Sequence, residues 1–583
     1  MKKLYLSLAL ILAMLLLACA AFAEETAVSS KDMDFYLIHK DDVQTKTVYF
    51  IGESDVPYMS LADFGELYTY LLKTYVNKGQ NISFGLSYSQ DGQTGTLTRT
   101  DGDPFTMTVD CDADTITFLD YDAFIRPEAD RVLLDVLEAD NPHGDDDVKF
   151  FRRAEGSYER YGDQVVLDAG SYGIDFVADE NGVYVPVQTL CDFLLSLKYV
   201  NPFYNGEAFF FVKMGDDESS LTDAEGEKTE FGKLFYSVEP KELSEAMTAY
   251  SYAELCLAFD NLYGLKESHG IKSFNDLALQ MGAREAFLSG DPNYADAALF
   301  GAIMLHLDDL HSCVLAQSPF TTGGFGMGAQ QFGVGRALLD SGKQDAIYGA
   351  ARALYYPDGV PAYEEIGNTA YITFDSFAPV PEGVDYYKTA PTADATDTIG
   401  IMAYAYSQIM REDSPIENVV LDLSKNGGGD ADTAVFVLAS FLGDGYASVQ
   451  NTMSGALATG VYNVDLNLDG QFDENDLGLL GKKRFALITQ NSFSCGNLVP
   501  NIFKNSHEVS LIGHTSGGGS CVVLPLTTAY GTYFRISGPQ RLAFVKNGSF
   551  YDVDRGADPD YPLFFPESFY DREELTDYVN TIK

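Results

Sequence analysis

The chain carries little positive charge. It has 38 Lys and Arg against 86 Asp and Glu, which gives a formal net charge of −48 over 583 residues. This excludes nucleic acid as a partner, because phosphate contacts need a basic face, and it argues equally against an anionic membrane surface. Although Trp is absent, 46% of the residues are apolar and 13% aromatic. The composition therefore predicts a folded protein, and the length predicts two to four domains.

Long apolar runs are confined to the N-terminus. Lys2 and Lys3 precede an apolar stretch that ends in Ala21-Phe22-Ala23 before Glu24. This pattern predicts a secretory signal peptide over residues 1–23, and hence an extracellular or cell-envelope location in a bacterium. Lipid anchoring at Cys19 is the alternative. No later run reaches 18 apolar residues, so we expect no transmembrane segment.

Cysteine is also scarce. Removing the signal peptide leaves six scattered cysteines without a Cys-x-x-Cys pair, which argues against cysteine-bound metal. Disulfides are compatible with export but not required, and Cys495 with Cys521 is the first pair to test.

Residues 30–215 alternate short strand patterns with turn signals. A weak repeat relates "VPYMSLADFGELYTYL" (56–71) to "VYVPVQTLCDFLLSL" (183–197), each a strand followed by an amphipathic helix. The region resembles the small α+β stalk modules in front of exported bacterial enzymes, including those named after copper amine oxidases. We interpret it as two modules that act as spacers rather than as a binding unit. Residues 216–235 are predicted to be an acidic linker.

Within residues 236–580 the predicted secondary structure changes from helices to alternating strands and helices. Apolar residues at three- and four-residue spacing predict helices to about residue 312, and from 362 apolar strands alternate with helical patterns. This alternation predicts an α/β domain with a partly parallel sheet.

Three stretches of this domain are placed at strand ends: "NVVLDLSKNGGGD" (418–430), "NSFSCGNLVP" (491–500) and "LIGHTSGGGSCVV" (511–523). The first and third run into glycines, which let backbone N–H groups approach a ligand. A phosphate cradle is excluded because no Gly-Lys-Ser/Thr follows. In the second, Ser494 follows an apolar strand and precedes a helix, where hydrolases expose a nucleophile but where serine is also an ordinary turn residue.

In this order the three stretches resemble the tail-specific, or C-terminal-processing, serine proteases, over roughly residues 240–575. Those proteases carry an Asp-x-Arg-x-Asn-Gly-Gly strand end, an Asn-x-Ser-Ala-Ser-like turn and a Gly-x-x-Thr-x-Gly-Lys-Gly segment. The resemblance implies a ClpP/crotonase-like α/β protease domain, with Ser494 as the nucleophile and proteins or peptides as substrates.

The chain departs from this pattern at the residue that serves as the catalytic base. The family's lysine is replaced by Gly518, so a Ser–Lys dyad is not available. A branch that resembles the tricorn protease uses a histidine from an upstream Asp-x-His segment, which implies His311 here. That branch also has a carboxylate before a Gly-x-x-Pro-Asp segment, which implies Asp554, with Asp552 next. His514 is the rival base.

A serine nucleophile needs a base, an orienting carboxylate and donors for the oxyanion. The expected donors are the backbone N–H of Cys495 and that of Gly427 or Gly428. Two alternatives stay open: a catalytically inactive protein that binds a peptide or small ligand on the same fold, and an esterase-type acyl hydrolase with the same triad.

A separate motif, "DLNLDGQFDEND" (465–476), has the spacing of an EF-hand loop, with glycine at position 6. It predicts a structural calcium ion, with no cofactor for catalysis. The ligands would be Asp465, Asn467, Asp469, the Gln471 carbonyl, Asp473 and Asp476. The alternative is an acidic turn in an acidic chain.

Overall fold

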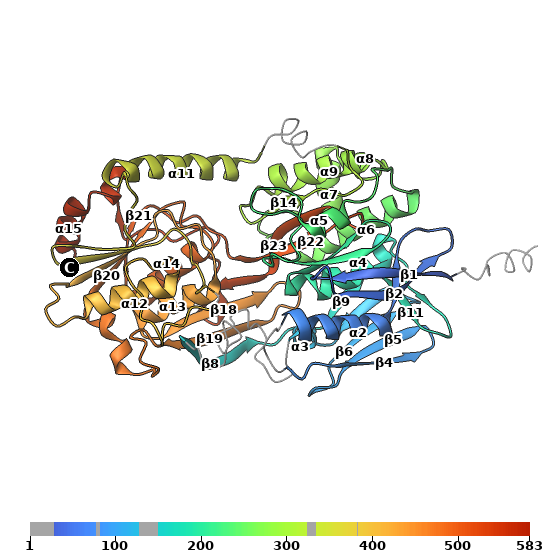
Figure 1. Cartoon of the computed structure of the whole chain (residues 1–583), viewed down its shortest axis with the longest axis horizontal. Coiled ribbons are helices and arrows are strands. Elements are labelled where there is room, and N and C mark those ends of the chain that lie inside the picture. The colour runs from blue at the N-terminus through green and yellow to red at the C-terminus, as the bar shows by residue number, and fades with distance from the viewer. Residues whose placement is uncertain (1–27, 77–81, 127–149, 323–333, 382) are drawn as a thin grey trace, which may run out of the picture.

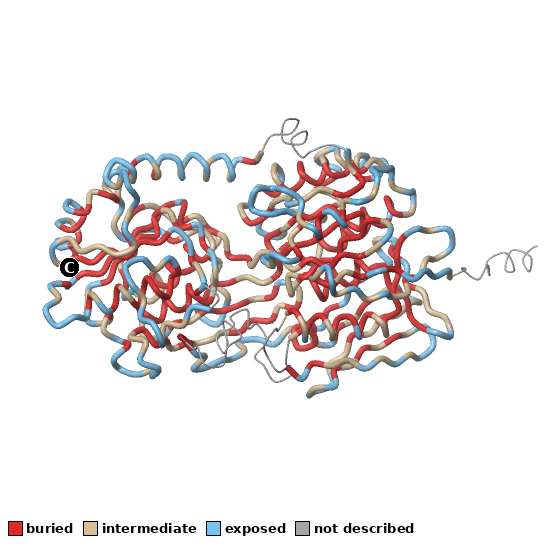
Figure 2. The backbone as a smooth tube through the Cα atoms, viewed as in Figure 1, coloured by how far each residue is buried: buried red, intermediate tan, exposed pale blue. Residues whose placement is uncertain are grey.

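The computed structural model describes residues 28–76, 82–126, 150–322, 334–381 and 383–583. These form two lobes joined by long strands (Figure 1). The N-terminal lobe holds a seven-stranded and a five-stranded sheet together with helices α6 to α9, and the C-terminal lobe holds a six-stranded, mostly parallel sheet with its helices. Buried backbone concentrates inside each lobe and thins where the two meet (Figure 2). The predicted signal peptide and Cys19 lie outside the described residues.

The N-terminal lobe is built around the repeat seen in the sequence. The first copy forms β3 (Tyr58–Ser60) and α2 (Leu61–Leu71), and the second forms β11 (Val183–Pro186) and α4 (Val187–Leu194). The two strands pair antiparallel with each other, in a sheet of order β10-β11-β3-β2-β1-β13-β12. The repeats therefore share one sheet, in which β1 (Val28–Leu37) pairs with a strand from the end of the region. The remaining strands of this sheet are β2 (Val43–Ile51), β10 (Val177–Ala178), β12 (Val200–Tyr204) and β13 (Phe209–Lys213).

The five-stranded sheet packs beneath it in the order β4-β5-β6-β7-β9, and alternation of apolar and polar residues gives it one buried face. Its strands are β4 (Leu86–Asp91), β5 (Thr94–Arg99), β6 (Thr106–Asp110), β7 (Thr115–Phe118) and β9 (Val165–Asp168), with α3 (Tyr121–Ile125) after β7.

Two segments differ from the predicted boundaries. Residues 151–160, placed by the sequence in the N-terminal modules, form β8 (Phe151–Arg160), which pairs with β19 (Leu457–Val464) of the C-terminal part. The expected linker ends in a helix, α5 (Glu230–Phe235), whose Phe231 and Phe235 are buried against aromatic residues of the first sheet. Pairing and burial draw both segments into the fold.

The predicted helical segment is confirmed. It consists of α6 (Glu245–Leu262), α7 (Phe274–Met281), α8 (Arg284–Phe287), α9 (Pro292–Gly301) and the π-turn η4 (Ala302–Leu307). After β14 (Cys313–Ala316) the chain reaches α11 (Arg336–Tyr355), which lies along one side of the molecule toward the C-terminal lobe (Figure 1).

The C-terminal lobe contains the predicted α/β sheet. Its order is β15-β16-β17-β20-β21-β26, and all pairs except β15–β16 are parallel. The central strands β17 (Asn418–Asp422) and β20 (Lys483–Ile488) are almost wholly buried, as expected for a sheet covered on both faces. The flanking strands are β15 (Tyr363–Ile366), β16 (Thr369–Thr373), β21 (Ser510–Gly513) and β26 (Tyr561–Pro562), and the helices are α12 (Thr398–Ile409), α13 (Ala431–Leu442), α14 (Cys495–Ser506) and α15 (Arg572–Thr581).

One long strand, β23 (Tyr533–Ala543), connects the lobes. Its first half pairs with β14, and its second half pairs with β18 (Gly445–Asn451). β22 (Cys521–Thr527) runs antiparallel beside it. His311 lies two residues before β14, so the pairing of β14 with β23 fixes the chain just after it. Among the described residues, we find no helix that combines the length and apolar character needed to cross a bilayer.

Candidate active site

The turn after β20 holds Ser494 in a strained conformation. Ser494 has φ 56° and ψ −122°, a region that non-glycine residues rarely occupy, and it immediately precedes helix α14. The turn is fixed because the Ser494 N–H donates to the Gly518 carbonyl (2.9 Å), while its own carbonyl accepts from the N–H groups of Asn497 and Leu498. Such a strained strand-to-helix turn is how α/β hydrolases present a nucleophile. Strain of this kind costs about 1–3 kcal/mol and is concentrated at functional sites.

The glycines after β17 lie against this turn. A Cβ added at Gly428 would sit 2.5 Å from the Ser494 Cβ and 3.1 Å from the Cys495 nitrogen, and Gly428 has φ 99°. Only glycine fits there. A Cβ at Gly519, from the third motif, would lie 3.1 Å from the Ser494 nitrogen. The three motifs therefore meet around one residue, because β17, β20 and β21 are neighbours in the parallel sheet.

The expected oxyanion donors differ in availability. The Gly427 N–H donates to the Asp375 carbonyl (3.1 Å), and the Gly428 N–H donates to the Asn426 Oδ1 (2.9 Å). Both are therefore engaged, which the sequence could not reveal. Within the described ranges, the N–H groups of Cys495 and Gly429 have no hydrogen-bond partner. The Cys495 Sγ lies 3.3 Å from the Gly429 carbonyl oxygen and connects these two backbone segments.

His311 is packed against the nucleophile turn. Its ring centroid lies 4.7 Å from that of Phe493, the residue before Ser494, and its side chain is buried. Asp309 Oδ1 accepts from the N–H groups of His311 and Ser312 (3.0 Å each), which fixes the turn. Burial lowers the pKa of His311 to about 4, with Arg535 acting in the same direction, so the imidazole is neutral at physiological pH. No hydrogen bond joins the ring to the Ser494 hydroxyl in this structure, as is common in uncomplexed sites.

Asp554 is the carboxylate that acts on His311 from the C-terminal lobe. The negative charges of Asp309 and, to a smaller extent, of Asp554 oppose the lowering of the His311 pKa. Ser520 donates from its N–H to Oδ1 and from its hydroxyl to Oδ2 (2.7 Å each), and Arg541 pairs with Oδ2. Burial opposes ionisation, but Ser520 and Arg541 hold the pKa of Asp554 below its ordinary value. Asp552 contacts Arg541 (2.8 Å) and the Asp554 N–H (3.0 Å), so it supports the cluster from outside.

His514 has a different environment. Its Nδ1 lies 2.7 Å from the Tyr348 hydroxyl, and its Nε2 is hydrogen-bonded to the Leu563 carbonyl. Both ring nitrogens are thus occupied by groups that join α11 and the β26 segment to the end of β21.

The predicted EF-hand loop is closed by its own hydrogen bonds. Asp465 accepts from the N–H groups of Asp469 (3.0 Å) and Gly470 (2.7 Å). Asp476 accepts from the Leu466, Asn467 and Asp473 N–H groups. Across the part of the chain that is described, no three His, Cys, Asp or Glu side chains converge as a metal site.

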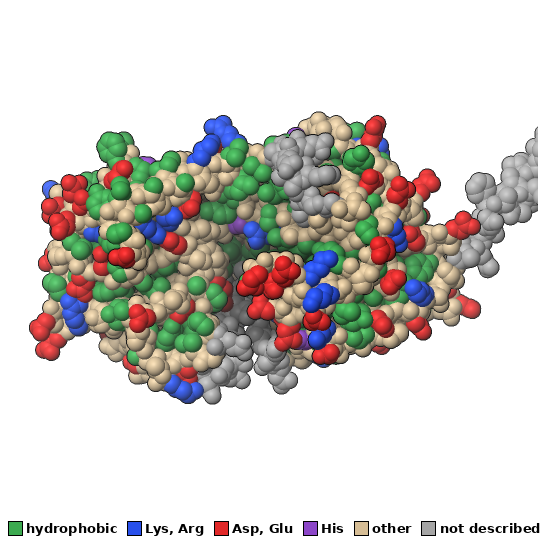
Figure 3. Space-filling view, turned by 45° about the horizontal axis from the view of Figure 1, so that its top comes forward, with side chains coloured by type: hydrophobic (Ala, Val, Ile, Leu, Met, Phe, Trp, Pro, Cys, Tyr) green, Lys and Arg blue, Asp and Glu red, His purple; other side chains and the backbone are tan. Residues whose placement is uncertain are grey.

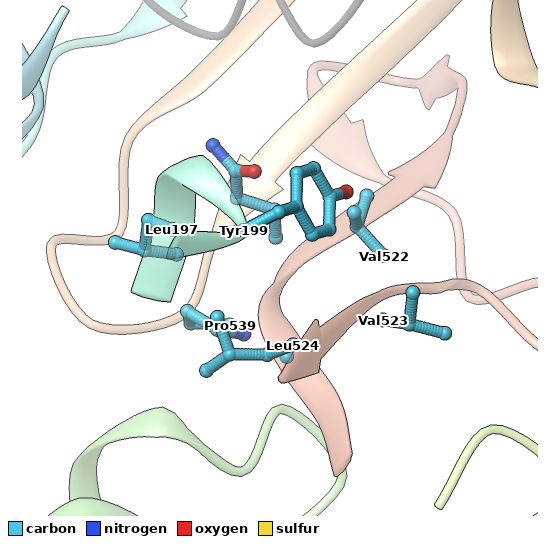
Figure 4. A pocket seen from close by; sticks show the side chains of 8 residues that line it. Leu197, Tyr199, Val522, Val523, Leu524 and Pro539 are labelled. Carbon is cyan, nitrogen blue, oxygen red and sulfur yellow. The ribbon is translucent and has the colours of Figure 1, made fainter. Parts of the chain in front are cut away.

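The six cysteines outside the signal peptide are all free, including Cys495 and Cys521, so the disulfide first considered for that pair does not form. A small pocket lies beside β22 and β23. Leu197 and Tyr199 line it on one side, and Val522 to Leu524 and Pro539 on the other (Figure 4).

Sequence reasoning missed three residues of the site: Ser520, Arg535 and Arg541. Ser520 belongs to "TSGGGS" and could have been suspected as a partner of the third motif. The two arginines lie on β23, where no local pattern marks them.

A family model and several known proteins are similar to parts of this chain. Residues 368–562 match the family model described as peptidase family S41. A Chlamydia pneumoniae protein, CPj1016/CpB1054, is 30% identical over 151 residues, which cover 24% of this chain and 23% of that protein. The chain thus spans under a quarter of that relative's length.

Solved structures resemble the chain at lower identity. The photosystem II D1 C-terminal processing protease is 16% identical with a TM-score of 0.27, over 36% of this chain and 46% of that one. Mature CPAF complexed with lactacystin is 14% identical with a TM-score of 0.24, over 36% and 50%. The tricorn protease is 11% identical with a TM-score of 0.28, over 85% and 46%.

The family match confirms the resemblance drawn from the three motifs, whereas the tricorn-like branch with a histidine base stays a prediction. Residues 368–562, which match the peptidase family S41 model, include Gly428, Ser494 and Asp554.

Proposed function

We propose that the protein is a serine peptidase that cleaves peptide bonds through Ser494, His311 and Asp554. The observation that carries this proposal is the strained Ser494 turn, with Gly428 against its Cβ and the buried His311 against its neighbour Phe493. The family match supports hydrolysis of peptide bonds. Since His311 lies outside the matched residues, its role depends on the geometry alone.

The chemistry follows from the protonation states. Neutral His311 accepts the proton of the Ser494 hydroxyl as its oxygen attacks the substrate carbonyl, and it later returns the proton to the leaving amine. Asp554, kept ionised by Ser520 and Arg541, stabilises the imidazolium that forms between these steps. The Cys495 N–H, at the N-terminus of α14, would donate to the oxyanion, and the Gly429 N–H is the second available donor. A Gly427 or Gly428 N–H could serve only after its present hydrogen bond breaks.

The test has two parts. The protein is treated with a fluorophosphonate probe and the label is located by mass spectrometry, and hydrolysis of denatured casein is measured separately. The proposal expects label on Ser494 and cleavage of casein. Label on Ser494 with hydrolysis of p-nitrophenyl esters but not of casein would favour an esterase. A folded protein that takes no label would favour the inactive binding protein.

Three further features belong to the same proposal. The protein is exported by the segment 1–23 or anchored at Cys19, and the N-terminal lobe serves as a stalk-like spacer for a ClpP/crotonase-like domain. Calcium binds residues 465–476 and stabilises the fold without entering the chemistry. Its support is the spacing of the loop and the burial that raises the pKa of Asp465 and of Asp476, since a cation would offset the cost of two ionised carboxylates there.

A further inference from the structure

One arginine beside the candidate base has no acidic partner. Arg535 lies on β23 and pairs with Cys313 on β14. Cys313 is two residues after His311 in the sequence. The Arg535 Nε donates to the His311 main-chain carbonyl (3.0 Å). Its charge is close enough to the imidazole to contribute to the lowered pKa of His311, and it acts on the Cys313 thiol in the same direction. The guanidinium therefore sits at the edge of the site, half-buried.

Three other half-buried or buried arginines are paired with carboxylates. Arg352 contacts Asp375, Arg541 contacts Asp552 and Asp554, and Arg572 contacts Asp422. Within the described ranges, Arg535 contacts no carboxylate, although the chain has 86 acidic residues. A cation that is partly removed from water without a counter-charge is costly, so such groups are usually paired or serve a ligand.

The two nearest site carboxylates are already occupied. Asp309 accepts from Ser537, Ser312 and Tyr263 side chains in addition to two backbone N–H groups. Asp554 is held by Ser520 and Arg541 on both oxygens. Neither can turn to Arg535 without giving up these hydrogen bonds. Besides its Nε bond to the His311 carbonyl, Arg535 interacts with the side chain of Cys313. Its remaining N–H donors are available to a carboxylate from outside the chain.

The position of Arg535 suits a substrate group. Figure 3 shows a hollow between the lobes with apolar side chains along part of its rim. Apolar walls strengthen a charged hydrogen bond because they exclude water. Arg535 is hydrogen-bonded to the main chain of His311, the candidate base. A substrate carboxylate bound to Arg535 would therefore lie close to the bond that is cleaved. The planar donor fork of Arg535 matches a carboxylate.

We propose that Arg535 determines specificity by binding the carboxylate of an acidic side chain of the substrate near the cleaved bond. This inference rests on the proposed peptidase function. A charged hydrogen bond of this kind is expected to give about a ten- to hundredfold preference over the uncharged amide.

The first experiment measures cleavage. The best-cleaved site of denatured casein is made as a synthetic peptide in matched forms, with Glu and Asp or with Gln and Asn, and with a free or an amidated C-terminus. The wild-type kcat/KM should favour the peptides with Glu and Asp over those with Gln and Asn about ten- to hundredfold. A preference that depends only on the free C-terminus contradicts the proposal. In Arg535→Gln this ratio should fall toward one. Arg535→Lys should keep part of it, and Lys546→Gln, which removes an exposed cation, should keep all of it.

The ratio of kcat/KM between the matched peptides distinguishes a role of Arg535 in specificity from a role in positioning His311. If Arg535 only holds His311, then Arg535→Gln lowers kcat/KM equally for all forms, and the proposal is wrong. It is equally wrong if the wild type shows no preference. Thermal melting of each variant establishes that it is folded before its ratio is interpreted.

The second experiment does not need turnover. Ser494→Ala and the Ser494→Ala, Arg535→Gln double variant are immobilised, and peptides retained from a tryptic casein digest are identified by mass spectrometry. The single variant should retain peptides enriched in carboxylates at a fixed position, and the double variant should lose that enrichment. No retention, or equal enrichment on both, contradicts the proposal. Fluorophosphonate labelling of wild-type Ser494 reports on the peptidase function independently of either result.

Discussion

His311 and His514 both lie at ends of secondary structure near Ser494, and their surroundings separate a chemical role from a structural one. Both ring nitrogens of His514 are hydrogen-bonded, to the Tyr348 hydroxyl and the Leu563 carbonyl, so it joins three segments. The ring of His311 has no hydrogen-bond partner among the described residues, and it is buried against Phe493. A buried imidazole left without partners is costly unless a ligand or a reaction uses it. The comparison teaches that satisfied hydrogen bonds, more than proximity to a motif, distinguish these two histidines.

The largest expected effect comes from removing the candidate nucleophile. Ser494→Ala should lower kcat by about 10⁶-fold, because triad members act as a unit. The measurement is casein hydrolysis with a fluorescent substrate. Ser506→Ala, which removes a hydroxyl at the other end of α14, should have little effect. Wild-type activity in Ser494→Ala would show that Ser494 is not the nucleophile. Neither histidine could then be its base.

The second prediction tests the comparison directly. His311→Ala should lower kcat/KM by about 10⁴-fold with a nearly unchanged melting temperature. His514→Ala should lower activity less than tenfold but destabilise the fold by about 1–3 kcal/mol, because it leaves buried partners unpaired. Activity assays and urea denaturation of both variants decide it. If the two patterns are exchanged, His514 is the base.

The third prediction concerns the groups that hold Asp554. Arg541→Gln removes its counter-charge, which should raise the pKa of Asp554 and lower kcat by about ten- to a hundredfold. Arg541→Lys should restore part of the rate, and the loss should be greatest at low pH, where the carboxyl protonates. A loss that is equal at every pH would instead indicate a packing defect.

The fourth prediction uses the pKa of His311. Only the neutral imidazole accepts a proton, so activity should be lost as pH falls through about 4 and not through the ordinary 6.5. At pH 5.5 the wild type should therefore be about tenfold more active than an enzyme with an unperturbed histidine base. The pH profile of kcat/KM measures this. An acidic limb near 6.5 would mean that water reaches the ring in solution, and would weaken the contrast with His514.

The sequence predicted the centre of the site better than its surroundings. The strands before Ser494 and Gly428 were recognisable because buried parallel strands are continuous apolar runs that end in turn residues. Their adjacency followed from the order of the motifs. The partners of Asp554 were not recognisable, since Arg541 reaches it only through the pairing of β22 with β23, which contains a register shift after Cys521.

Long-range pairing also explains the errors at the boundaries. β8 lies within the N-terminal region of the sequence but pairs with β19, some 300 residues later. Its exposed, charged pattern is compatible with several partners. In the same way, Gly427 and Gly428 were reasonable oxyanion donors by sequence, but local hydrogen bonds to Asp375 and Asn426 occupy their N–H groups.

The smallest expected effect, on stability alone, concerns the loop 465–476, which lies between the glycine turn and the strand that leads to Ser494. Its hydrogen bonds already close it, so calcium should tighten an existing turn and not create one. At one hundred times its Kd, calcium should raise the free energy of unfolding by about 2.7 kcal/mol while kcat changes little.

Thermal melts with calcium and with EDTA measure this effect. The Asp465→Asn, Asp469→Asn double variant should lose it, because amides bind the ion more weakly than carboxylates do. Asp110→Asn, in an acidic turn that also accepts two backbone N–H groups, should keep it and serves as the matched control. Acidification should abolish the effect as well, since protonated Asp465 and Asp476 no longer attract a cation, and their raised pKa values place that loss above the ordinary range for aspartate. Equal melting temperatures in calcium and EDTA would reduce the loop to an acidic turn.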